Sequence, residues 1–419
     1  MATVTVAGGN GVEYRLNYGL SPGAAVSQLA AAINEQVARG NVSSQIYHGG
    51  LQPPSTPAGR VGLAVFPGIN NQVNLTLAEK IVLVNGGGPN TIAGGGATGQ
   101  QVLADDGDLT YFTGGGSGII ATGNGRNVIG STAGSFNITT GSGDDTILGL
   151  GGTVTATGGT GRNVMFTGTG QTSYIARGDD TVLGVGDTTG LGSDTVGVEA
   201  NQSLRIAHNA NSLTFVNGGG SSTVYGGFGS SGTGSATVFG GRGGGIYQGG
   251  RTGHNVLLGQ EGTVTLFGGG EADLLYVAGA GTNLLVAGAG NETLLGAANS
   301  GGSYYFAGNN STTATANTQI AAGNNADTVI AGTGNLTVDG GLGADLIVFA
   351  NGQAGGSTVI DGFRRGEGDR VTLVRYEGGE LSRALSRAQT SNGSTTLTLS
   401  DNTRITFSGV SSLDSESFV

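Results

Sequence analysis

Short apolar runs alternate with glycine-rich clusters along most of this 419-residue chain. Between residue 79 and about residue 350, pairs and triplets of Val, Ile and Leu are separated by segments of Gly, Asn, Asp and Thr. Brief apolar runs that are bounded by such turn residues are typical of short β-strands. The pattern therefore predicts a mostly β segment built from very short strands and tight turns.

The turn residue before each apolar pair recurs at a nearly constant interval of 17 to 19 residues. The first run of these residues is Asn90, Asp108, Asn127, Asp145, Asn163 and Asp180; the second is Asn255, Asp273 and Glu292; the third is Asp327 and Asp345. A period of about 18 residues predicts a parallel β-solenoid (β-roll), in which each coil holds two short strands and coils stack about 4.8 Å apart. Residues 79–350 would then form roughly fifteen coils at that period. The phase is poor between residues 185 and 235, which predicts insertions or irregular loops there.

The two ends of the chain differ from this repeat. Residues 1–78 predict a small α+β domain, with a β-prone opening around a Gly-Asn-Gly turn and a helix from about Pro22 to Arg39. Ser21 suits the N-cap of that helix and Gly40 suits its C-terminal stop. We expect this domain to cap the solenoid or to present a docking surface.

Residues 351–419 predict a β-rich cap. A charged, strand-like segment is followed by a short helical pattern, ELSRALSRAQ, and by a hairpin with Asp401 and Asn402 at its turn. The solenoid itself is therefore assigned to residues 79–350.

Composition narrows the classes of protein that the chain can belong to. Glycine accounts for 88 residues, charged residues for 11%, and cysteine and tryptophan are absent. Proline numbers only six and no G-X-Y period is present, so the chain is not collagen-like. The absence of cysteine excludes disulfides and thiolate metal sites. The net charge of −11, with Lys80 as the single lysine, argues against binding of nucleic acid. The sequence contains no run of about 18 apolar residues, so it predicts no membrane-spanning helix.

The best-formed turn suggests a calcium site. Residues 340–348 (GGLGADLIV) fit the pattern G-G-x-G-x-D-x-U-x, and two nonapeptides precede them in frame. Asp327 and Asp345 lie two half-turns apart, on the same side of the predicted stack. Calcium takes six to eight oxygen ligands, which stacked glycine turns can supply as backbone carbonyls together with one Asp from each level. The candidate ligands are Asp327, Asp345, Gly341, Gly343, Asn325, Asp145 and Asp180.

These nonapeptides resemble the hemolysin-type calcium-binding repeats of RTX proteins. The segment ADLIVFANGQAGGSTVIDGFRRGEGDRVTL resembles the block that follows the β-roll in serralysin-like and other RTX proteins. The final TLTLSDNTRITFSGVSSLDSESFV is similar to the terminal hairpin and uncleaved secretion signal of type I substrates. The resemblance is strong over residues 320–419, weaker over 80–320 and absent over 1–78. It implies export by a type I secretion machinery and a calcium-rich location outside a Gram-negative-type bacterium, or on its surface.

The repeat departs from that family at the aspartate position. Asn127 and Asn163 stand where a full calcium β-roll has aspartate. An amide supplies a neutral oxygen and two donors, so stacked Asn residues can bond to one another without metal. We therefore expect few calcium ions and a partly metal-independent stack. Simple turn chemistry is the alternative explanation of the Asp/Asn column, because both residues tolerate left-handed backbone conformations.

Signals for catalysis are weak. None of the three histidines lies in H-E-x-x-H, no P-loop occurs, and Ser21 in a G-x-S-x-G pattern is better explained as a helix cap. The sequence therefore favours a non-enzymatic, secreted calcium-binding protein that assembles with itself into a surface layer, a filament or a biofilm matrix. A secreted adhesin or carbohydrate-binding module that recognises a cell-surface glycan remains the alternative. A solenoid polysaccharide lyase or epimerase that uses paired turn carboxylates is a further one.

Overall fold

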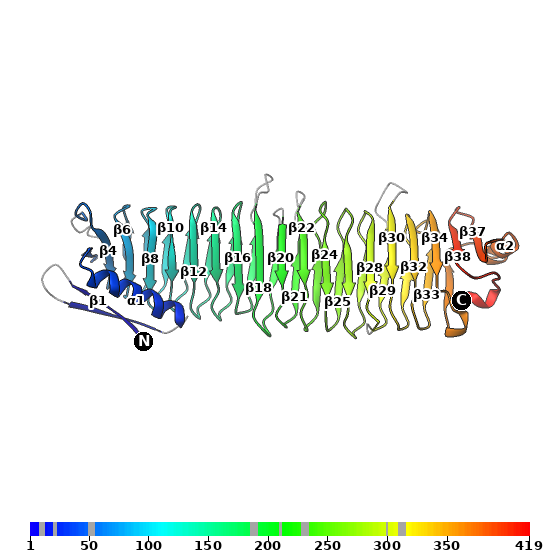
Figure 1. Ribbon diagram of the computed structural model, residues 1–419, viewed down its shortest axis with the longest axis horizontal. Coiled ribbons are helices and arrows are strands. Elements are labelled where there is room, and N and C mark those ends of the chain that lie inside the picture. Colours follow the sequence, from blue (N-terminus) through cyan, green and yellow to red (C-terminus); the bar gives the residue numbers. More distant parts are fainter. Residues whose placement is uncertain are drawn as a thin grey trace. The chain divides into compact units, whose positions relative to one another are not determined.

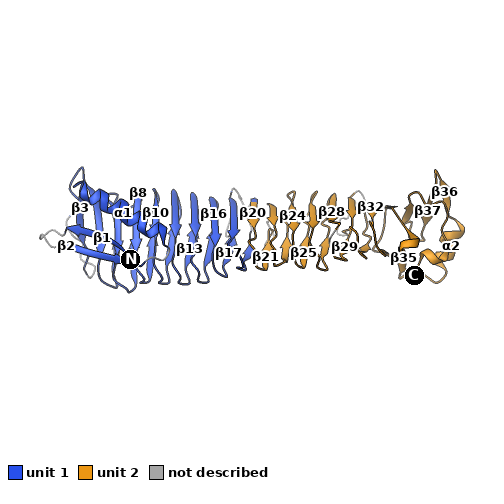
Figure 2. Cartoon of the chain, turned by 60° about the horizontal axis from the view of Figure 1, so that its bottom comes forward, with its two compact units in different colours: residues 1–212 blue, residues 213–419 orange. Residues whose placement is uncertain are grey.

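A computed structural model describes residues 1–7, 13–19, 23–48, 55–184, 192–208, 212–227, 234–298, 301–308 and 316–419. The fold is mostly β, with 46% of residues in strands and 7% in helices. It is a parallel β-solenoid of about 15 turns with about 19 residues per coil, which confirms the predicted fold class and coil number. The chain divides into two compact units, Met1–Ser212 and Leu213–Val419 (Figure 2).

Two parallel sheets, here called sheet B and sheet C, form the solenoid of the first unit (Figure 1). The strands of sheet B are β3 Val42–Ile46, β4 Val61–Phe66, β6 Glu79–Val84, β8 Thr98–Ala104, β10 Ser117–Ala121, β12 Ser135–Thr139, β14 Thr153–Thr157, β16 Gln171–Ala176 and β18 Ser193–Val198. The strands of sheet C are β5 Gln72–Asn74, β7 Asn90–Ala93, β9 Leu109–Phe112, β11 Val128–Ser131, β13 Thr146–Gly149, β15 Val164–Thr167, β17 Thr181–Gly184 and β19 Arg205–Ala207. Successive coils therefore contribute one strand to each sheet.

The second unit repeats this arrangement. Its parallel strands in sheet B are β20 Ser212–Val216, β22 Ser235–Phe239, β24 Val256–Gly259, β26 Leu274–Val277, β28 Glu292–Gly296, β30 Asn317–Ala321, β32 Asn335–Asp339, β34 Ser357–Asp361 and β38 Arg404–Phe407. Its strands in sheet C are β21 Ser222–Tyr225, β23 Gly245–Gln248, β25 Val264–Phe267, β27 Leu284–Val286, β29 Tyr304–Phe306, β31 Thr328–Ile330, β33 Leu346–Ala350 and β35 Arg370–Val374. Residues 185–191, 209–211 and 228–233, in the stretch where irregular loops were predicted, lie outside the described residues.

Alternation along each strand builds a narrow core between the two sheets. In β13, Ile147 is fully buried while its neighbours Thr146 and Leu148 are only partly buried. The register continues in the next coil, where Ile147 pairs with the buried Met165. Because successive side chains of a strand point to opposite faces, every second residue enters the core and the others form the outer faces.

The N-terminal segment forms a hairpin and a helix. Strands β1 Ala2–Ala7 and β2 Glu13–Tyr18 pair antiparallel, and α1 spans Ala24–Ala38. Gly40 follows the helix with a φ of 71°, so its predicted role as the stop is confirmed. The Gly-Asn-Gly turn and the predicted cap residues Ser21 and Pro22 lie outside the described residues.

The hairpin and α1 lie on the outer face of sheet B and share a buried cluster with its strands (Figure 1). Ile33 of the helix and Val6 of the hairpin share one buried cluster with Leu63, Leu83 and Leu103 of the sheet. The first strands of the sheet are apolar on both faces, which is typical of parallel strands that are covered on both sides. The parallel strands also begin at β3, inside the segment 1–78 that the sequence assigned to a separate domain.

The C-terminal segment extends sheet B. Strand β38 pairs parallel with β34 and antiparallel with β37 Ser394–Thr398, which in turn pairs with β36 Gln389–Ser391. The predicted hairpin is confirmed, with Asn402 in a left-handed conformation at its turn. The predicted helix is also present as α2 Glu380–Ser386. Neither of the two α-helices in the described part of the chain is long and apolar enough to cross a bilayer.

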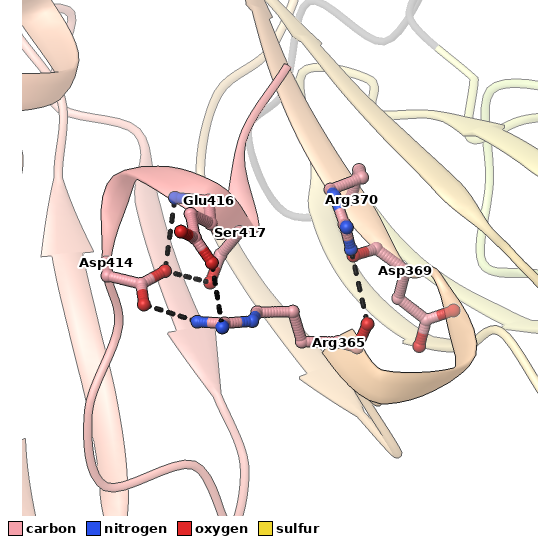
Figure 3. Close-up of polar contacts among 6 residues, drawn as sticks. All are labelled: Arg365, Asp369, Arg370, Asp414, Glu416 and Ser417. Atoms are coloured by element: carbon pink, nitrogen blue, oxygen red, sulfur yellow. Dashed lines mark hydrogen bonds and ion pairs between the residues drawn. The ribbon is translucent and has the colours of Figure 1, made fainter.

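The last residues lie along the edge of sheet C. Phe418 forms a parallel bridge with Val371 of β35, and the Val419 backbone N–H donates to the Val371 carbonyl at 3.0 Å. Arg365, at the start of the 3-10 turn η1 Arg365–Glu367, forms ion pairs with Asp414 and Glu416 (Figure 3). These ion pairs hold the second 3-10 turn, η2 Ser415–Ser417, beside the edge strand.

Candidate metal-binding turns

A buried column of residues precedes the strands of sheet C, and we call it the inner column. Its members include Asn71, Asn90, Leu109, Asn127, Asp145, Asn163, Asp180 and Leu204 in the first unit, and Val264, Asn283, Ser303, Asp327, Asp345 and Asp369 in the second. A second buried column, Asn255, Asp273 and Glu292, precedes strands of sheet B. The first and third predicted runs therefore belong to one sheet, and the second run belongs to the other.

Asp108 does not belong to the inner column, so its predicted place in the ladder is wrong. The strand register aligns Leu109 with Asn90 and with Asn127, and Leu109 is buried. Asp108 lies one residue earlier, on the outside of the turn, where its carboxylate contacts Arg126 at 3.3 Å. The repeat at this coil is 19 residues long, so counting 18 selected the neighbour of the true column residue.

Most amide and carboxylate side chains of the inner column tie their coil to the preceding one. The Asn127 backbone N–H donates to Asp145 Oδ1 at 2.8 Å, and the Asp145 N–H donates to Asn163 Oδ1 at 3.0 Å. The Asn163 N–H donates in the same way to Asp180 Oδ1 at 2.8 Å. These bonds satisfy a buried backbone donor just before each strand begins, which an apolar residue cannot do.

The second polar atom distinguishes Asn from Asp at this position. In three turns the Asn Nδ2 donates to carbonyl oxygens two and four residues earlier in its own turn. The pairs are Asn127 with Gly125 at 2.8 Å and Gly123 at 3.2 Å, Asn163 with Gly161 at 3.3 Å and Gly159 at 3.0 Å, and Asn283 with Gly281 at 2.9 Å and Gly279 at 3.3 Å. The amide group therefore fills the centre of the glycine turn.

Asp327 and Asp345 occupy the same position without that donor. Their Oδ1 atoms accept the N–H groups of Ser303 at 2.6 Å and of Asp327 at 2.8 Å. Their Oδ2 atoms are buried and have no hydrogen-bond partner among the described residues. Burial raises the pKa of Asp327 to about 7, with the nearby charge of Asp345 as a further cause, and burial raises the pKa of Asp345 to about 6. Two adjacent coils thus contain buried carboxylates whose Oδ2 atoms lack a hydrogen-bond donor.

The predicted backbone ligands lie where an Asn side chain would donate. The carbonyls two and four residues before Asp345 belong to Gly343 and Gly341, and the carbonyl two residues before Asp327 belongs to Asn325. Asn325 is an exposed residue of this turn. A cation at the place of the missing amide would meet carbonyl and carboxylate oxygens, which are the ligands that calcium takes.

The residues of these turns therefore fit calcium in their chemistry. Within the part of the chain that the structure describes, no cluster of three or more His, Cys, Asp or Glu side chains could hold a metal. The carboxylates of Asp327 and Asp345 would thus need several carbonyl oxygens beside them. An uncompensated, buried pair of carboxylates with free oxygens is the observation that favours a bound cation.

Glycine is required where these coils touch. Gly341 and Gly343 have φ values of 83° and 131°, in the region that side chains disfavour. A Cβ on Gly341 would lie 1.6 Å from the Gly323 carbonyl oxygen, and one on Gly343 would lie 2.7 Å from the Asn325 carbonyl oxygen. The backbones of adjacent turns are therefore in direct contact, so carbonyl groups of the two turns lie close to each other.

Arg364 and Asp369 complete the last turn, and the sequence analysis missed both. The Arg364 guanidinium donates to the Gly341 carbonyl, and its backbone N–H donates to Asp369 Oδ2 at 2.6 Å. Asp369 Oδ1 accepts the Asp345 N–H at 3.1 Å, so Asp369 belongs to the inner column. The step from Asp345 to Asp369 is 24 residues, so a fixed period could not find it. A fixed positive charge thus lies beside the Asp345 turn.

Asp145 and Asp180 differ from that pair. In the described part of the chain, Asp145 Oδ2 has no hydrogen-bond partner, and burial raises the pKa of Asp145 to about 6. Its neighbours in the column, however, are the amides Asn127 and Asn163. Asp180 Oδ2 accepts a hydrogen bond at 2.7 Å from the buried hydroxyl of Tyr174. Asp180 is therefore satisfied by the protein itself, and Tyr174 is a further residue that sequence reasoning missed.

The second column has one uncompensated carboxylate as well. Asp273 Oδ1 accepts the Asn255 N–H at 2.7 Å, while Glu292 Oε2 is buried and finds no hydrogen-bond partner among the residues that the structure describes. Burial, followed by the negative charge of Asp273, raises the pKa of Glu292 to about 8. In the first unit, Asp194 is paired instead with the buried His208 at 2.7 Å.

The fold and these columns define the chain as a parallel β-solenoid whose turns are held by buried Asn and Asp side chains. No protein-family model matches the chain, and neither does any curated protein.

Proposed function

We propose that this chain is a calcium-stabilised, non-enzymatic structural protein that assembles with itself outside the cell. The observation that supports this proposal is the difference between Asn and Asp in the inner column. The amides of Asn127 and Asn163 fill their turns, whereas Asp327 and Asp345 leave buried carboxylate oxygens without a partner. A bound calcium ion would supply a partner for those free carboxylate oxygens.

In this proposal calcium is held by Asp327 and Asp345 together with turn carbonyls that include those of Asn325 and Gly343. Ionisation of the two carboxylates is a condition of binding, because calcium competes with the protons that burial favours. Calcium at the millimolar level found outside cells suits a site with few carboxylates. The resemblance to RTX repeats supports the same location, with export through a type I secretion machinery from a Gram-negative-type bacterium.

The rest of the molecule supports a structural role. The solenoid is held by parallel strands and by side-chain bonds that repeat from coil to coil, which suits a stiff building block. Repeat proteins of this kind gain stability from each neighbouring coil and need protected ends. A surface layer, a filament or a biofilm matrix would use such a block repeatedly.

Electron microscopy of the full chain, with excess calcium and with chelator, tests assembly. Ordered sheets or filaments that form only with calcium support the proposal, and dispersed particles under both conditions contradict it. Specific binding on a glycan array by dispersed particles would favour the adhesin alternative.

Calorimetric titration of the same chain tests the calcium site. We expect the double variant Asp327→Asn/Asp345→Asn to lose the heat of calcium binding. The control variant Asp179→Asn, which changes an exposed turn residue, should keep it. Equal calcium binding by the double variant and the wild type would contradict the assignment of the site.

A further inference from the structure

One strand of sheet B in the first unit has a neighbour on one side only. Strand β3 pairs in parallel with β4, and it pairs with no other strand in the described part of the chain (Figure 2). An edge strand presents a row of unpaired N–H and C=O groups, which a strand from another chain can use. The edge of β3 is therefore a candidate contact surface.

The hydrogen bonds to β4 show which backbone groups of β3 are free. The Tyr47 N–H donates to the Val65 carbonyl at 2.8 Å, and the Asn41 carbonyl accepts the Val61 N–H at 3.1 Å. Backbone groups alternate in direction along a strand, so the odd-numbered residues of this segment face β4. The residues that direct their N–H and C=O groups outward, where no described residue bonds to them, are Val42, Ser44 and Ile46.

The side chains of β3 do not protect this edge. The strand (VSSQI) contains no charged residue and no proline, which are the residues that commonly prevent pairing at a free edge. Val42 and Ile46 are half-buried, because they pack against the cluster that α1 and the hairpin form with sheet B. That cluster covers the outer face of β3, whereas the backbone edge has no partner among the described residues.

The other described strand edges differ from β3. Phe418 bridges to β35 at the end of sheet C. Strands β5 and β36 are only three residues long and have no exposed apolar side chain. Asn34 of α1 bonds to the backbone of β1 at two positions, and β2 carries the charged residues Glu13 and Arg15. Among the described edges, β3 is thus distinguished by its length, its apolar residues and its lack of charge.

The outward residues of β3 match their own inverted copy. A two-fold axis perpendicular to sheet B, through Ser44, places a second β3 antiparallel to the first. Both cores then stay on the same side of a continuous sheet. Ser44 lies opposite its own copy, and Val42 lies opposite Ile46. Each opposed pair exchanges two backbone hydrogen bonds, which gives about six bonds in an isologous contact.

We propose that a second copy of this chain pairs with the free edge of β3 through its own β3, so that sheet B continues from one copy into the other. In this register an apolar residue opposes an apolar residue and a serine opposes a serine, and such matched cross-strand pairs stabilise a sheet. Val42 and Ile46, which are half-buried in one copy, would be covered further by the second copy.

This contact is small. A single pair of strands belongs to the weak class of interfaces, which bury less than about 1,200 Å². Each copy offers one edge of this kind among its described strands, so the contact by itself gives a dimer. The inference rests on the proposed function in one respect, that the chain associates with itself, and the pairing of β3 needs no calcium.

Charges placed on the axis test the pairing. Ser44→Lys would oppose two lysines and Ser44→Glu two glutamates, and like charges directly opposite each other are destabilising. In sedimentation velocity at low ionic strength, we expect each variant to raise the dissociation constant of the dimer at least tenfold. An equal mixture of the two variants should recover the dimer, because lysine then opposes glutamate. The matched control is Ser135→Lys, since Ser135 is exposed on β12, which is paired on both sides. It should sediment as the wild type does.

A disulfide provides a second readout, since the chain has no cysteine of its own. The Cα atoms of a hydrogen-bonded antiparallel pair lie about 5.5 Å apart, within the range of about 4.4–6.8 Å that a disulfide spans. We expect the full-length Ser44→Cys chain to form a covalent dimer under mild oxidation. The control variant Ser135→Cys should form at least tenfold less.

Several results would overturn the inference. These are a wild type that sediments as a monomer at every concentration, Ser44→Lys and Ser44→Glu chains that each associate as the wild type does, and equal disulfide formation by the two cysteine variants. A monomeric wild type that binds an added VSSQI peptide would assign the edge to a foreign strand. Calcium-dependent assembly without the Ser44→Cys disulfide rejects this edge but leaves the proposed function standing. The β3 dimer without any larger assembly does the reverse.

Discussion

The turns before the strands of sheet C are filled by different inner-column side chains in the two units of the molecule. In the first unit, Asn127 and Asn163 alternate with Asp145 and Asp180, and the amides donate to turn carbonyls. In the second unit, Asp327 and Asp345 follow each other directly, so two consecutive column positions carry a carboxylate in place of an amide. The backbone bond between coils is the same in both units, so the difference lies only in what fills the turn.

This comparison shows that backbone pairing and charge compensation are separate requirements of the fold. Any side-chain oxygen at the column position can accept the N–H of the preceding coil. A carboxylate adds a charge that must be neutralised by a proton, a donor or a cation. Tyr174 supplies a donor to Asp180, Arg364 places a positive charge near Asp345, and Asp327 has neither.

The largest expected effect is that of pH on the calcium-free protein, because several carboxylates respond together. Burial raises the pKa of Asp327 to about 7 and the pKa values of Asp145 and Asp345 to about 6, against about 4 in an unfolded chain. Their protonation stabilises the fold fully below pH 4, and this contribution is lost as pH rises through 6 to 7.

Urea unfolding in chelator should therefore show a lower midpoint at pH 8 than at pH 5. Added calcium should restore the midpoint at pH 8, because the cation pairs with the ionised form. Carboxylates with lowered pKa values, such as Asp401, lose their contribution only in more acidic solution and do not reverse the trend. A midpoint that is constant from pH 5 to pH 8 would contradict the raised pKa values of these buried carboxyls, on which the comparison rests.

Asn163→Asp makes the first unit resemble the second. The change removes the Nδ2 donor from the Gly159 and Gly161 carbonyls and places a carboxylate between Asp145 and Asp180. We expect a loss of about 3 kcal/mol in chelator at neutral pH, since buried polar groups are left without partners. Thermal unfolding by circular dichroism measures it, with Asn124→Asp in an exposed turn position as the control. An unchanged melting temperature would contradict the role of the amide.

Asp327→Asn makes the second unit resemble the first. The new amide can donate to the Gly323 and Asn325 carbonyls while its oxygen keeps the bond from Ser303. We expect the chelated protein to gain about 1–2 kcal/mol, because an uncompensated buried carboxylate disappears. The difference between the melting temperatures with and without calcium should shrink. A variant that is less stable in chelator than the wild type would show that Asp327 is compensated in some other way.

Tyr174→Phe tests compensation by a hydroxyl. The variant leaves Asp180 Oδ2 without its donor, and we expect it to cost about 1 kcal/mol in chelator. Tyr304→Phe, which removes an exposed hydroxyl, is the matched control and should cost nothing measurable. Part of the loss should be recovered by calcium if a cation can replace the hydroxyl, and equal melting of both variants would reject this role of Tyr174.

The smallest effect is expected on the outside of the turns. Arg126 and Asp108 form an exposed ion pair on the same coils as the inner column. Arg126→Gln should change the free energy of unfolding by less than about 0.5 kcal/mol, since solvent screens exposed pairs. A loss of stability as large as that of Asn163→Asp would show that exposed and buried residues of these turns contribute equally to stability.

Sequence periodicity predicted much of this arrangement. Asn127, Asp145, Asn163 and Asp180 recur at a nearly constant step, and the structure places them in one column. The prediction failed where the repeat length changes. One additional residue moved Asp108 out of the column, and longer turns hid Asp369 at a step of 24 residues. A fixed period also could not show that Asn255 and Asp273 precede strands of the other sheet, because both half-coils have similar sequences.

The sequence by itself determined the coil, because glycine turns and alternating apolar residues are local properties that each repeat expresses alone. It also indicated which residues face the turn. Only the tertiary structure decided which carboxylates are compensated, since Tyr174 and Arg364 reach Asp180 and Gly341 from other strands and turns. The position of α1 was decided in the same way, because its apolar face needed the apolar outer face of sheet B. Local sequence specifies a backbone conformation, whereas the charge and burial of a side chain depend on neighbours that folding brings from other strands and turns.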